Sequence, residues 1–565
     1  MKQLLLLLLI VTCLFSTSRI STGKTITKND LNKVGTSIPA SEIGEPVGSV
    51  KLYAPRWIEA EGSNPDYAVV EGSIFPADPN GWPINFRALL PSDWSRRTLQ
   101  QGGGGFNGTI TVRDGFHPLL SKGYVLYGSD SGHQVHGMGF PGAPQPKVLA
   151  TGPTKGDEWA LNEEVMQNLG YMQMKKTHDA VMAIVKRVYG EAPEYNYYVG
   201  NSQGGREAVT VAQRYPEDYD GIISNVPIVN FSTLMLAPVL LRIQEIPEVN
   251  WITSDKEALI AKEFLRQCDA LDGLSDGIIN NYVKARELFN VNDGKGPDDP
   301  WAALRKSGEL TDGQIETLEL TFSSYRFANP LANGVESFGM WIPNVTPGGS
   351  GIIDNRRYKG QEGAAEDAPL YTHMGILGVT GFLMQDIDAN SLDYVEGGKW
   401  EKRRQQLSRW LDSTDPDLAA FYNRGGKIIF TIGAGDNLAS SGSQLDYYQS
   451  LLDKMGRDKI DEFARMYVVP NGGHGLSGRS YSENGDGEKI DVKNIAAPDG
   501  NDNLEQLVNW VENDKAPAKT LAIGPRGEIS ERLEGEGYLM CSYPSYAKYT
   551  SGPKNMVSSY SSVKP

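Results

Sequence analysis

The stretch YNYYVGNSQGGREA, residues 195–208, decides the fold prediction for this chain of 565 residues. Aromatic and β-branched residues from Tyr195 to Val199 predict a buried strand, and a helix is expected after Gly205. Between them lies a G-x-S-x-G motif, Gly200 to Gly204. In this context Ser202 would sit on a strained turn at the carboxyl edge of a sheet, as a nucleophile requires. An ordinary βα turn is the alternative interpretation.

Neighbouring segments predict that this unit belongs to a larger parallel sheet. Short strands are expected from Thr98 and from Tyr124 to Tyr127, on the amino-terminal side of the motif. A further strand is expected at Gly221 to Ser224, after the helix that follows Ser202. A strand, a tight turn, a helix and a second strand form a βαβ unit, the building block of parallel sheets.

The alternation of predicted strands and helices stops after this unit and resumes much later in the chain. Residues 231–424 contain helical stretches and few clean strands, whereas strands are expected again at Lys427 to Ile432 and at Met466 to Val469. The sequence therefore predicts an α/β-hydrolase fold with a large inserted lid domain. The predicted parts are the first part of the core, residues 50–230, the lid, residues 231–424, and the second part of the core, residues 425–565.

Composition excludes several classes of protein. With 39% hydrophobic residues and 10 Trp, the chain must bury a large core and is not disordered. The 70 acidic residues outnumber the 54 basic residues and give a net charge of −16. A basic surface for binding phosphates is therefore not expected, and neither is a nucleic-acid partner.

Residues 1–20 are predicted to be a signal peptide. Lys2 precedes a run of about a dozen apolar residues, and small polar residues follow that run. The run is short for a membrane span and no later segment approaches that length, so no transmembrane span is expected. The predicted location is secreted or periplasmic. Lipid anchoring through Cys13 is an alternative, although Thr12 is a poor residue immediately before a lipidated cysteine.

Two further residues complete a predicted catalytic triad with Ser202. A serine needs a general base, and in this fold the acid and the histidine follow the nucleophile after later strands. Asp436 follows the strand expected at Lys427 to Ile432, and His474 follows the strand expected at Met466 to Val469. His474 is the only histidine after Asp436, and a surface histidine in a glycine-rich loop is the alternative interpretation.

An oxyanion hole is expected beside the nucleophile. The attack of Ser202 on a carbonyl would create an oxyanion, which two backbone N–H groups usually stabilise. Gln203, directly after the nucleophile, is one predicted donor. The other is expected in the run Gly102 to Gly105, with Gly105 as the preferred donor. A flexible turn is the alternative interpretation of this run.

These motifs together resemble the tannase and feruloyl esterase family. The resemblance extends from about residue 85 to residue 550 and thus covers most of the chain. It implies a serine carboxylic ester hydrolase that cleaves small aromatic esters, feruloyl or galloyl esters among them, through an acyl-enzyme intermediate. The substrate can be free or attached to a plant polymer. The matching segments are Tyr198–Glu207, Gln213–Ile222, Gln101–Gly108, Ser129–His133, Asp415–Leu418, Gly425–Lys427 and Cys541–Pro544.

The resemblance also implies a structural Ca²⁺ site in the lid. The segment from Cys268 to Ile278 resembles the calcium loop of the family. Carboxylates and carbonyl oxygens suit a hard cation that takes six to eight oxygen ligands. A solvated acidic turn is the alternative interpretation. The expected ligands are the side chains of Asp269, Asp272 and Asp276 and the backbone carbonyls of Leu274 and Ile278.

One feature departs from the family. Its members usually carry a disulfide between a cysteine just before the nucleophile and a cysteine just after the histidine, whereas this sequence has Asn201 and Gly475 there. The family partners of Cys268 and Cys541 are missing too, so these are predicted to be unpaired thiols, with a bridge between them as the alternative.

Several functions remain open at the level of sequence. The leading prediction is an exported ester hydrolase of aromatic acids, in which lid residues such as Trp341, Tyr371 and Phe382 could form aromatic walls or simply be buried core. A serine hydrolase of other esters and a serine peptidase on the same fold are alternatives. A non-catalytic binding module on a hydrolase scaffold is a third.

Overall fold

The computed structural model of the chain describes residues 23–63, 65–113, 115, 117–134, 157–343, 370–497, 500–524 and 535–565. The predicted signal peptide and Cys13 lie outside these residues. None of the helices in the described ranges is long and apolar enough to cross a membrane.

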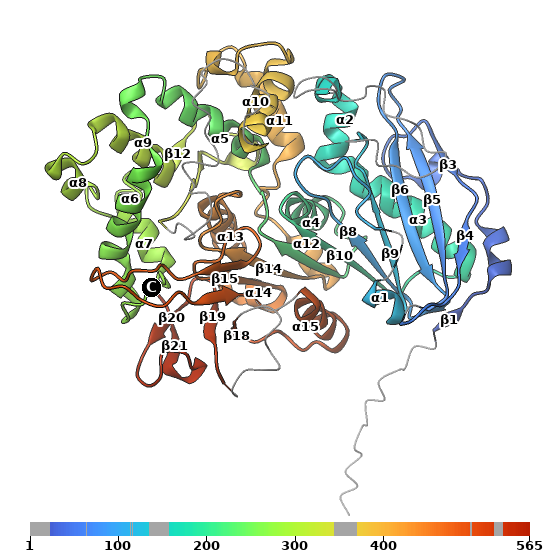
Figure 1. Cartoon of the computed structure of the whole chain (residues 1–565). Helices are drawn as coiled ribbons and strands as arrows, with labels where there is room; N and C mark the ends of the chain where they lie inside the picture. The colour runs from blue at the N-terminus through green and yellow to red at the C-terminus, as the bar shows by residue number, and fades with distance from the viewer. Residues whose placement is uncertain are drawn as a thin grey trace, which may run out of the picture.

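A mixed sheet of 13 strands forms the centre of the fold (Figure 1). Twelve of them follow one another in the order β18-β19-β15-β14-β11-β10-β8-β9-β6-β5-β3-β2, and β4 pairs with β5. The strands are β2 (Ser37–Ile38), β3 (Ser49–Leu52), β4 (Arg56–Ile58), β5 (Tyr67–Phe75), β6 (Ile84–Pro91), β8 (Arg97–Gln101), β9 (Tyr124–Ser129), β10 (Tyr195–Asn201), β11 (Gly221–Asn225), β14 (Lys427–Gly433), β15 (Ala464–Val469), β18 (Thr520–Ile523) and β19 (Tyr538–Ser542).

The middle of this sheet is parallel. Strands β9, β8, β10, β11, β14 and β15 pair in parallel, and Val199, Ile223 and Ile429 lie side by side in the register of three of them. Residues 428–433 of β14 are all buried, which explains their nearly continuous apolar sequence. Antiparallel strands extend the sheet at both ends, β6 to β2 on one side and β19 with β18 on the other.

Helices cover both faces of the parallel strands. Val209 of α4 packs in one core with Tyr198 and Phe430. On the opposite face, Trp510 of α15 packs with Tyr197 in another core. The helices of these layers are α1 (Pro118–Ser121), α3 (Gln173–Tyr189), α4 (Gln203–Arg214), α12 (Ala419–Arg424), α13 (Ser441–Met455), α14 (Arg457–Phe463) and α15 (Gly500–Asn513), whereas α2 (Glu163–Gln167) packs in the core of the insertion.

The segment between β11 and β14 is a helical insertion. The two strands pair directly, although about 200 residues separate them, and the inserted helices lie together above the sheet in Figure 1. Its interior contains an aromatic cluster in which the ring centroids of Phe289 and Trp301 lie 4.8 Å apart. The inserted helices are α5 (Phe231–Gln244), α6 (Ser254–Cys268), α7 (Tyr282–Phe289), α8 (Ala302–Ser307), α9 (Asp312–Phe322), α10 (Leu370–Leu377) and α11 (Glu401–Leu411).

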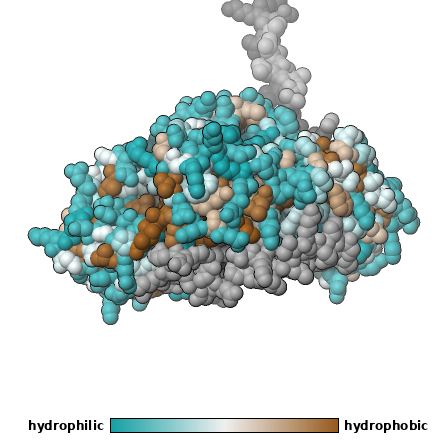
Figure 2. Space-filling model, turned by 90° about the horizontal axis from the view of Figure 1, so that it is seen from above, coloured by the Kyte–Doolittle hydropathy of each residue, from teal (hydrophilic) through white to brown (hydrophobic). Residues whose placement is uncertain are grey.

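The outer surface on this side is mostly hydrophilic, with hydrophobic residues in small patches (Figure 2). Ile246, Val249 and Val395 are large hydrophobic side chains of the insertion that are more than half exposed. Many other apolar residues of the insertion are buried in a core that they share with Trp159, Met166 and Leu169 of the first part of the chain.

The strands predicted around Ser202 are present in the structure as β8, β9, β10, β11, β14 and β15. The sheet also contains antiparallel strands that the sequence analysis did not single out. One of them, β2, lies before residue 50, where the first part of the core was expected to begin.

Candidate active site

Ser202 lies on the sharp turn between β10 and α4. Its φ of 60° and ψ of −117° are strained for a residue with a side chain. The turn is held by hydrogen bonds from the Ser202 N–H to the Asn225 carbonyl, 2.9 Å, and from the Arg206 N–H to the Ser202 carbonyl, 3.0 Å. A Cβ on Gly200 would lie 2.0 Å from the carbonyl oxygen of Gly204, which explains the glycine before the nucleophile.

Asp436 and His474 are in direct contact. The Nδ1 of His474 lies 3.0 Å from Oδ2 and 3.1 Å from Oδ1 of Asp436, a fully buried carboxylate that ends the turn after β14. The backbone N–H groups of Leu438 and Ala439 also donate to Oδ1, at 2.9 and 3.0 Å. Because a neutral imidazole that donates from Nδ1 carries no proton on Nε2, this pairing prepares Nε2 to act as a base.

The glycine loop after β8 is pressed against the start of α4. The Gly102 N–H donates to the Val199 carbonyl at 2.9 Å, and the Gly204 N–H donates to the Gly103 carbonyl at 3.0 Å. Gly105 has a φ of +60°, which favours glycine. Gln203 is the first residue of α4, so its N–H has no acceptor within the helix. Both predicted oxyanion donors therefore belong to backbone that the fold brings together.

A pocket of about 450 Å³ extends from the histidine loop along the carboxyl ends of β8, β10 and β11. His474, Gly475 and Asn201 line it, whereas Ser202 does not. Among the described lining residues none is an Asp, Glu, Lys or Arg. Burial lowers the pKa of His117, the other histidine in the wall, and so favours its neutral form. The pocket suits an uncharged group.

An aromatic cluster adjoins the glycine loop. Phe106, the residue after Gly105, is partly buried, and its ring lies 5.2 Å from Phe382, 5.8 Å from Trp159 and 5.9 Å from Phe231. The three partners are at most 4% exposed, so Phe106 is the ring of this cluster nearest to solvent. Phe382 is among the predicted aromatic walls, whereas Phe106 has no local sequence signal because its ring partners are distant in the chain.

The other two aromatic residues that were predicted as possible pocket walls are Trp341 and Tyr371. Trp341 is fully buried, and the side chain of Tyr371 lies outside the described residues. Phe382 is 1% exposed and contributes to the cluster from its interior. Buried core is therefore the structural role of Trp341 and Phe382 in this structure.

Comparison with known proteins decides the family. The family model described as "Tannase and feruloyl esterase" matches residues 68–563. The chain belongs to this family. The predicted resemblance is thus confirmed, and the chain is a carboxylic ester hydrolase of the tannase and feruloyl esterase type.

Individual relatives agree with this assignment. An uncharacterised esterase of Agrobacterium fabrum is 32% identical over 91% of this chain and 89% of its own length. A mono(2-hydroxyethyl) terephthalate hydrolase of Piscinibacter sakaiensis is 28% identical over 89% of this chain and 85% of its own. The crystal structure of feruloyl esterase B from Aspergillus oryzae superimposes with a TM-score of 0.66 at 21% identity, over 92% of this chain and 98% of that one. The predicted α/β-hydrolase fold is confirmed.

The loop that resembles the family's calcium site is buried in the insertion. Asp269, Asp272 and Asp276 are at most 4% exposed. Asp269 accepts backbone hydrogen bonds, for instance from Gly277 at 3.0 Å, whereas Oδ1 of Asp276 is buried without a hydrogen-bond partner. Lys493 is 4.0 Å from Asp276. Burial raises the pKa of Asp272 to about 8 and that of Asp276 to about 6.

The backbone of this loop also offers oxygens. None of the described N–H or O–H groups donates to the carbonyl oxygens of Leu274 and Ile278, although both residues are buried. Buried carbonyls are normally paired. Three buried carboxylates, one orphaned carboxylate oxygen and two unpaired carbonyls are a donor set that fits a hard cation.

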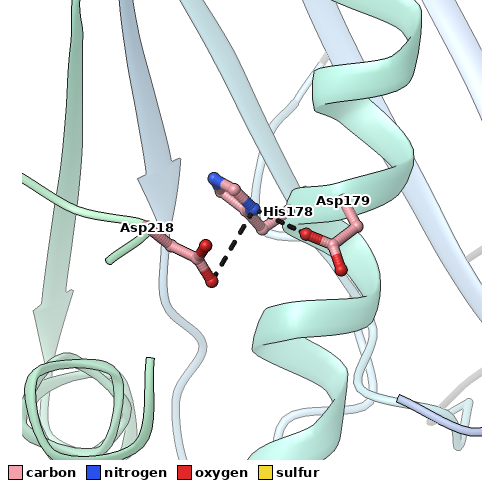
Figure 3. Close-up of side chains that lie close together, drawn as sticks. All are labelled: His178, Asp179 and Asp218. Carbon is pink, nitrogen blue, oxygen red and sulfur yellow. Dashed lines mark hydrogen bonds and ion pairs between the residues drawn. The ribbon is translucent and has the colours of Figure 1, made fainter. Parts of the chain in front are cut away.

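Another group of side chains in the described part of the chain places three potential metal ligands close together. Ligand atoms of His178, Asp179 and Asp218 all lie within 4.8 Å of one another (Figure 3), which those of the three loop aspartates do not. However, Nζ of Lys175 lies 2.8 Å from Asp179 and 2.9 Å from Asp218. This ammonium group forms an ion pair with each of the two carboxylates, so the group is an ion-pair cluster.

The cysteines are unpaired in the structure. Cys268 and Cys541 are both buried and free. Burial raises the pKa of both thiols, which makes them poor nucleophiles. At the positions that the family usually bridges, Asn201 and Gly475 line the same pocket.

This pair of positions offers a test by design. Gly475 does not have a positive φ, and a Cβ there would meet only Ser477 Oγ at 3.9 Å, so a side chain fits. We expect Asn201→Cys combined with Gly475→Cys to form a disulfide that raises stability by about 2–4 kcal/mol. Esterase activity and thermal inactivation, each measured with and without dithiothreitol, check this result. The wild type should be insensitive to the reductant, and strong inactivation of the wild type would contradict the assignment of two free thiols.

Proposed function

We propose that this esterase is an exported serine hydrolase that cleaves esters of aromatic acids, such as feruloyl or galloyl esters, through an acyl-enzyme. The observation that carries the proposal is the hydrogen-bonded pair Asp436–His474, together with Ser202 on a strained turn at the same sheet edge. A scaffold without catalysis would have no need for that turn or for a buried carboxylate behind a histidine.

The proposed reaction uses each residue in one role. His474 Nε2 removes the proton from Ser202 Oγ, which attacks the ester carbonyl, and Asp436 stabilises the resulting imidazolium. The backbone N–H groups of Gly105 and Gln203 stabilise the oxyanion. His474 then gives the proton to the departing alcohol. In the second half of the reaction His474 removes a proton from the water that attacks the acyl-enzyme, and it returns that proton to Ser202 Oγ as the acid leaves.

Two features support an aromatic acyl group and an uncharged alcohol. Phe106 presents an aromatic ring directly after the proposed oxyanion donor Gly105. The pocket on the side of His474 has no described Asp, Glu, Lys or Arg side chain in its wall. Relatives named feruloyl esterase and mono(2-hydroxyethyl) terephthalate hydrolase add support. The substrate can be a small ester or one attached to a plant polymer.

A substrate panel tests this proposal. Methyl ferulate, methyl gallate and a terephthalate monoester should each be compared with methyl acetate at equal concentration. We expect kcat/KM for at least one aromatic ester to exceed that for methyl acetate by ~100-fold or more, because a ring buries far more apolar surface. Equal values for all four esters would contradict an aromatic specificity and leave a serine hydrolase of other esters.

Export is part of the same proposal. The apolar run of residues 1–20 supports a signal peptide, and lipid anchoring through Cys13 is the competing version. The mass of the mature protein from culture medium or periplasm decides between them. Cleavage beyond Cys13 without a lipid mass supports the proposal, whereas a lipidated Cys13 at the amino terminus would contradict it.

We also propose that the acidic loop binds a structural Ca²⁺ ion. Asp269, Asp272 and Asp276 would hold it with the carbonyls of Leu274 and Ile278, where it would neutralise buried negative charge. It would pin the insertion to the second part of the core, because Asp269 also accepts a hydrogen bond from the Gly485 N–H at 2.6 Å. No reaction step passes through it.

Chelation tests the calcium proposal. EGTA should lower the thermal midpoint, because an ion whose free concentration is 100 times its Kd stabilises the folded state by about 2.7 kcal/mol. Asp272→Asn should lower the midpoint in the same way and remove its response to EGTA. Elemental analysis should find one calcium per chain. An unchanged midpoint in EGTA, with no calcium in the protein, would contradict the proposal.

A further inference from the structure

Glu207 is a buried carboxylate behind the glycine loop, five residues after Ser202. Its side chain is fully buried and accepts four hydrogen bonds. The donors are the Gly103 N–H at 3.0 Å, Asn107 Nδ2 at 2.5 Å, the Tyr198 hydroxyl at 2.9 Å and Gln173 Nε2 at 3.1 Å. All four neighbours donate to it, two to each carboxylate oxygen.

Two of these hydrogen bonds enclose the proposed oxyanion donor. Glu207 holds the backbone at Gly103 with Oε2 and the side chain of Asn107 with Oε1. Gly105 lies between these two points in the chain. The Asn107 N–H also donates to the Gly104 carbonyl at 2.7 Å, so Gly103 to Asn107 form a closed turn with Glu207 beneath it.

The contact between loop and helix leaves no free space. A Cβ on Gly102 would lie 2.6 Å from Cα of Gly204 and 2.9 Å from Oε2 of Glu207. A Cβ on Gly204 would lie 2.7 Å from the carbonyl oxygen of Gly103. The loop therefore lies in direct contact with the start of α4 and with the Glu207 carboxylate, and only glycine fits at these two positions.

We propose that Glu207 is a positioning residue that fixes the Gly105 N–H in the oxyanion hole. The inference rests on the proposed function, in which this N–H stabilises the charge that develops on the ester oxygen. Such stabilisation requires donors that are already in place when the charge forms. A carboxylate joined to both ends of the turn, and carried by the helix that begins at the nucleophile, couples the donor rigidly to Ser202.

The test is Glu207→Gln, which keeps the size of the side chain but replaces one oxygen by an NH₂ group. That group faces either the Gly103 N–H or the Asn107 amide, so one end of the turn loses its hydrogen bond to a carboxylate oxygen. We expect kcat for methyl ferulate to fall by ~10- to 100-fold, with KM within about threefold of wild type. Affinity for a trifluoromethyl ketone, whose adduct with Ser202 carries an oxyanion, should fall by the same factor as kcat/KM.

Two further variants serve as a control and as a second test of the same turn. Tyr198→Phe removes a donor to Glu207 that does not belong to the loop, and it should keep wild-type kcat and ketone affinity. Asn107→Gly releases the other end of the turn without a backbone penalty, because Asn107 has a φ of +65°. It should lower kcat and ketone affinity in parallel, which keeps the test valid if Glu207→Gln does not fold.

The outcomes separate this inference from the proposed function. Turnover and ketone binding by the wild type test the function on their own. If Glu207→Gln and Asn107→Gly keep wild-type kcat and ketone affinity while only their thermal midpoints fall, Glu207 is purely structural and the inference is overturned. The esterase function would stand in that case.

Discussion

Ser202→Ala should lower kcat for methyl ferulate by a factor on the order of 10⁵. A serine hydrolase without its nucleophile keeps only the rate enhancement that substrate binding and the oxyanion hole supply. Alanine has nearly the same backbone preferences as serine, so the strained turn at φ 60° is no worse than before. The thermal midpoint should therefore stay close to that of the wild type. Initial rates and thermal unfolding of both proteins check this.

Ser477→Ala is the matched control. Ser477 begins the short strand β16 (Ser477–Arg479) after the histidine loop and is exposed, and it has no proposed role in the reaction. It should keep wild-type kcat. Residual activity of Ser202→Ala near the wild-type level would mean that another group is the nucleophile.

Asp436→Asn should lower kcat by about 10⁴-fold. The asparagine oxygen can keep the hydrogen bonds from the N–H groups of Leu438 and Ala439, which Oδ1 accepts in the wild type. Its NH₂ group then takes the place of Oδ2 and donates to His474 Nδ1. The imidazole is forced into the tautomer that carries a proton on Nε2, which cannot act as a base.

Measurement of kcat and of the thermal midpoint separates this effect from unfolding. The geometry is conserved in the variant, so the midpoint should change far less than the activity. A variant with wild-type kcat would show that the contact between Asp436 and His474 does not serve catalysis.

The places of Ser202, Asp436 and His474 after strands of one sheet could be predicted because each signal is local. Each of these residues lies at most five residues after a strand whose apolar sequence can be recognised without its partner strands, as at Lys427–Gly433 before Asp436. Parallel strands bring their carboxyl ends to one edge, so local prediction is enough to place the three residues at the same edge.

Glu207 and Phe106 could not be predicted in the same way. Glu207 lies in a helix next to the nucleophile, and the sequence does not reveal that Gly103, Asn107 and Gln173 will surround it. The role of a buried polar group depends on the hydrogen-bond partners that the tertiary fold places around it. The same holds for Phe106, whose ring partners come from three distant segments of the chain.

The amino-terminal strands escaped prediction for a different reason. In β5, Tyr67–Phe75, eight of nine residues are buried, including Glu71 and Ser73. Glu71 is satisfied by Arg87 of the neighbouring strand at 2.8 Å, and Ser73 by Asn85 at 2.7 Å. Polar residues that pair across strands break the simple apolar pattern from which buried strands are recognised.

The most direct test of the central claim is covalent labelling of Ser202. The wild-type protein should be treated with a fluorophosphonate, while methyl ferulate hydrolysis and intact mass are followed together. We predict one adduct per chain, located by peptide mapping on Ser202, with loss of activity in proportion to labelling and no adduct on Ser202→Ala. Full hydrolysis of methyl ferulate by a protein that carries the label on Ser202, or inactivation with the label on another residue, would contradict the claim that Ser202 is the nucleophile.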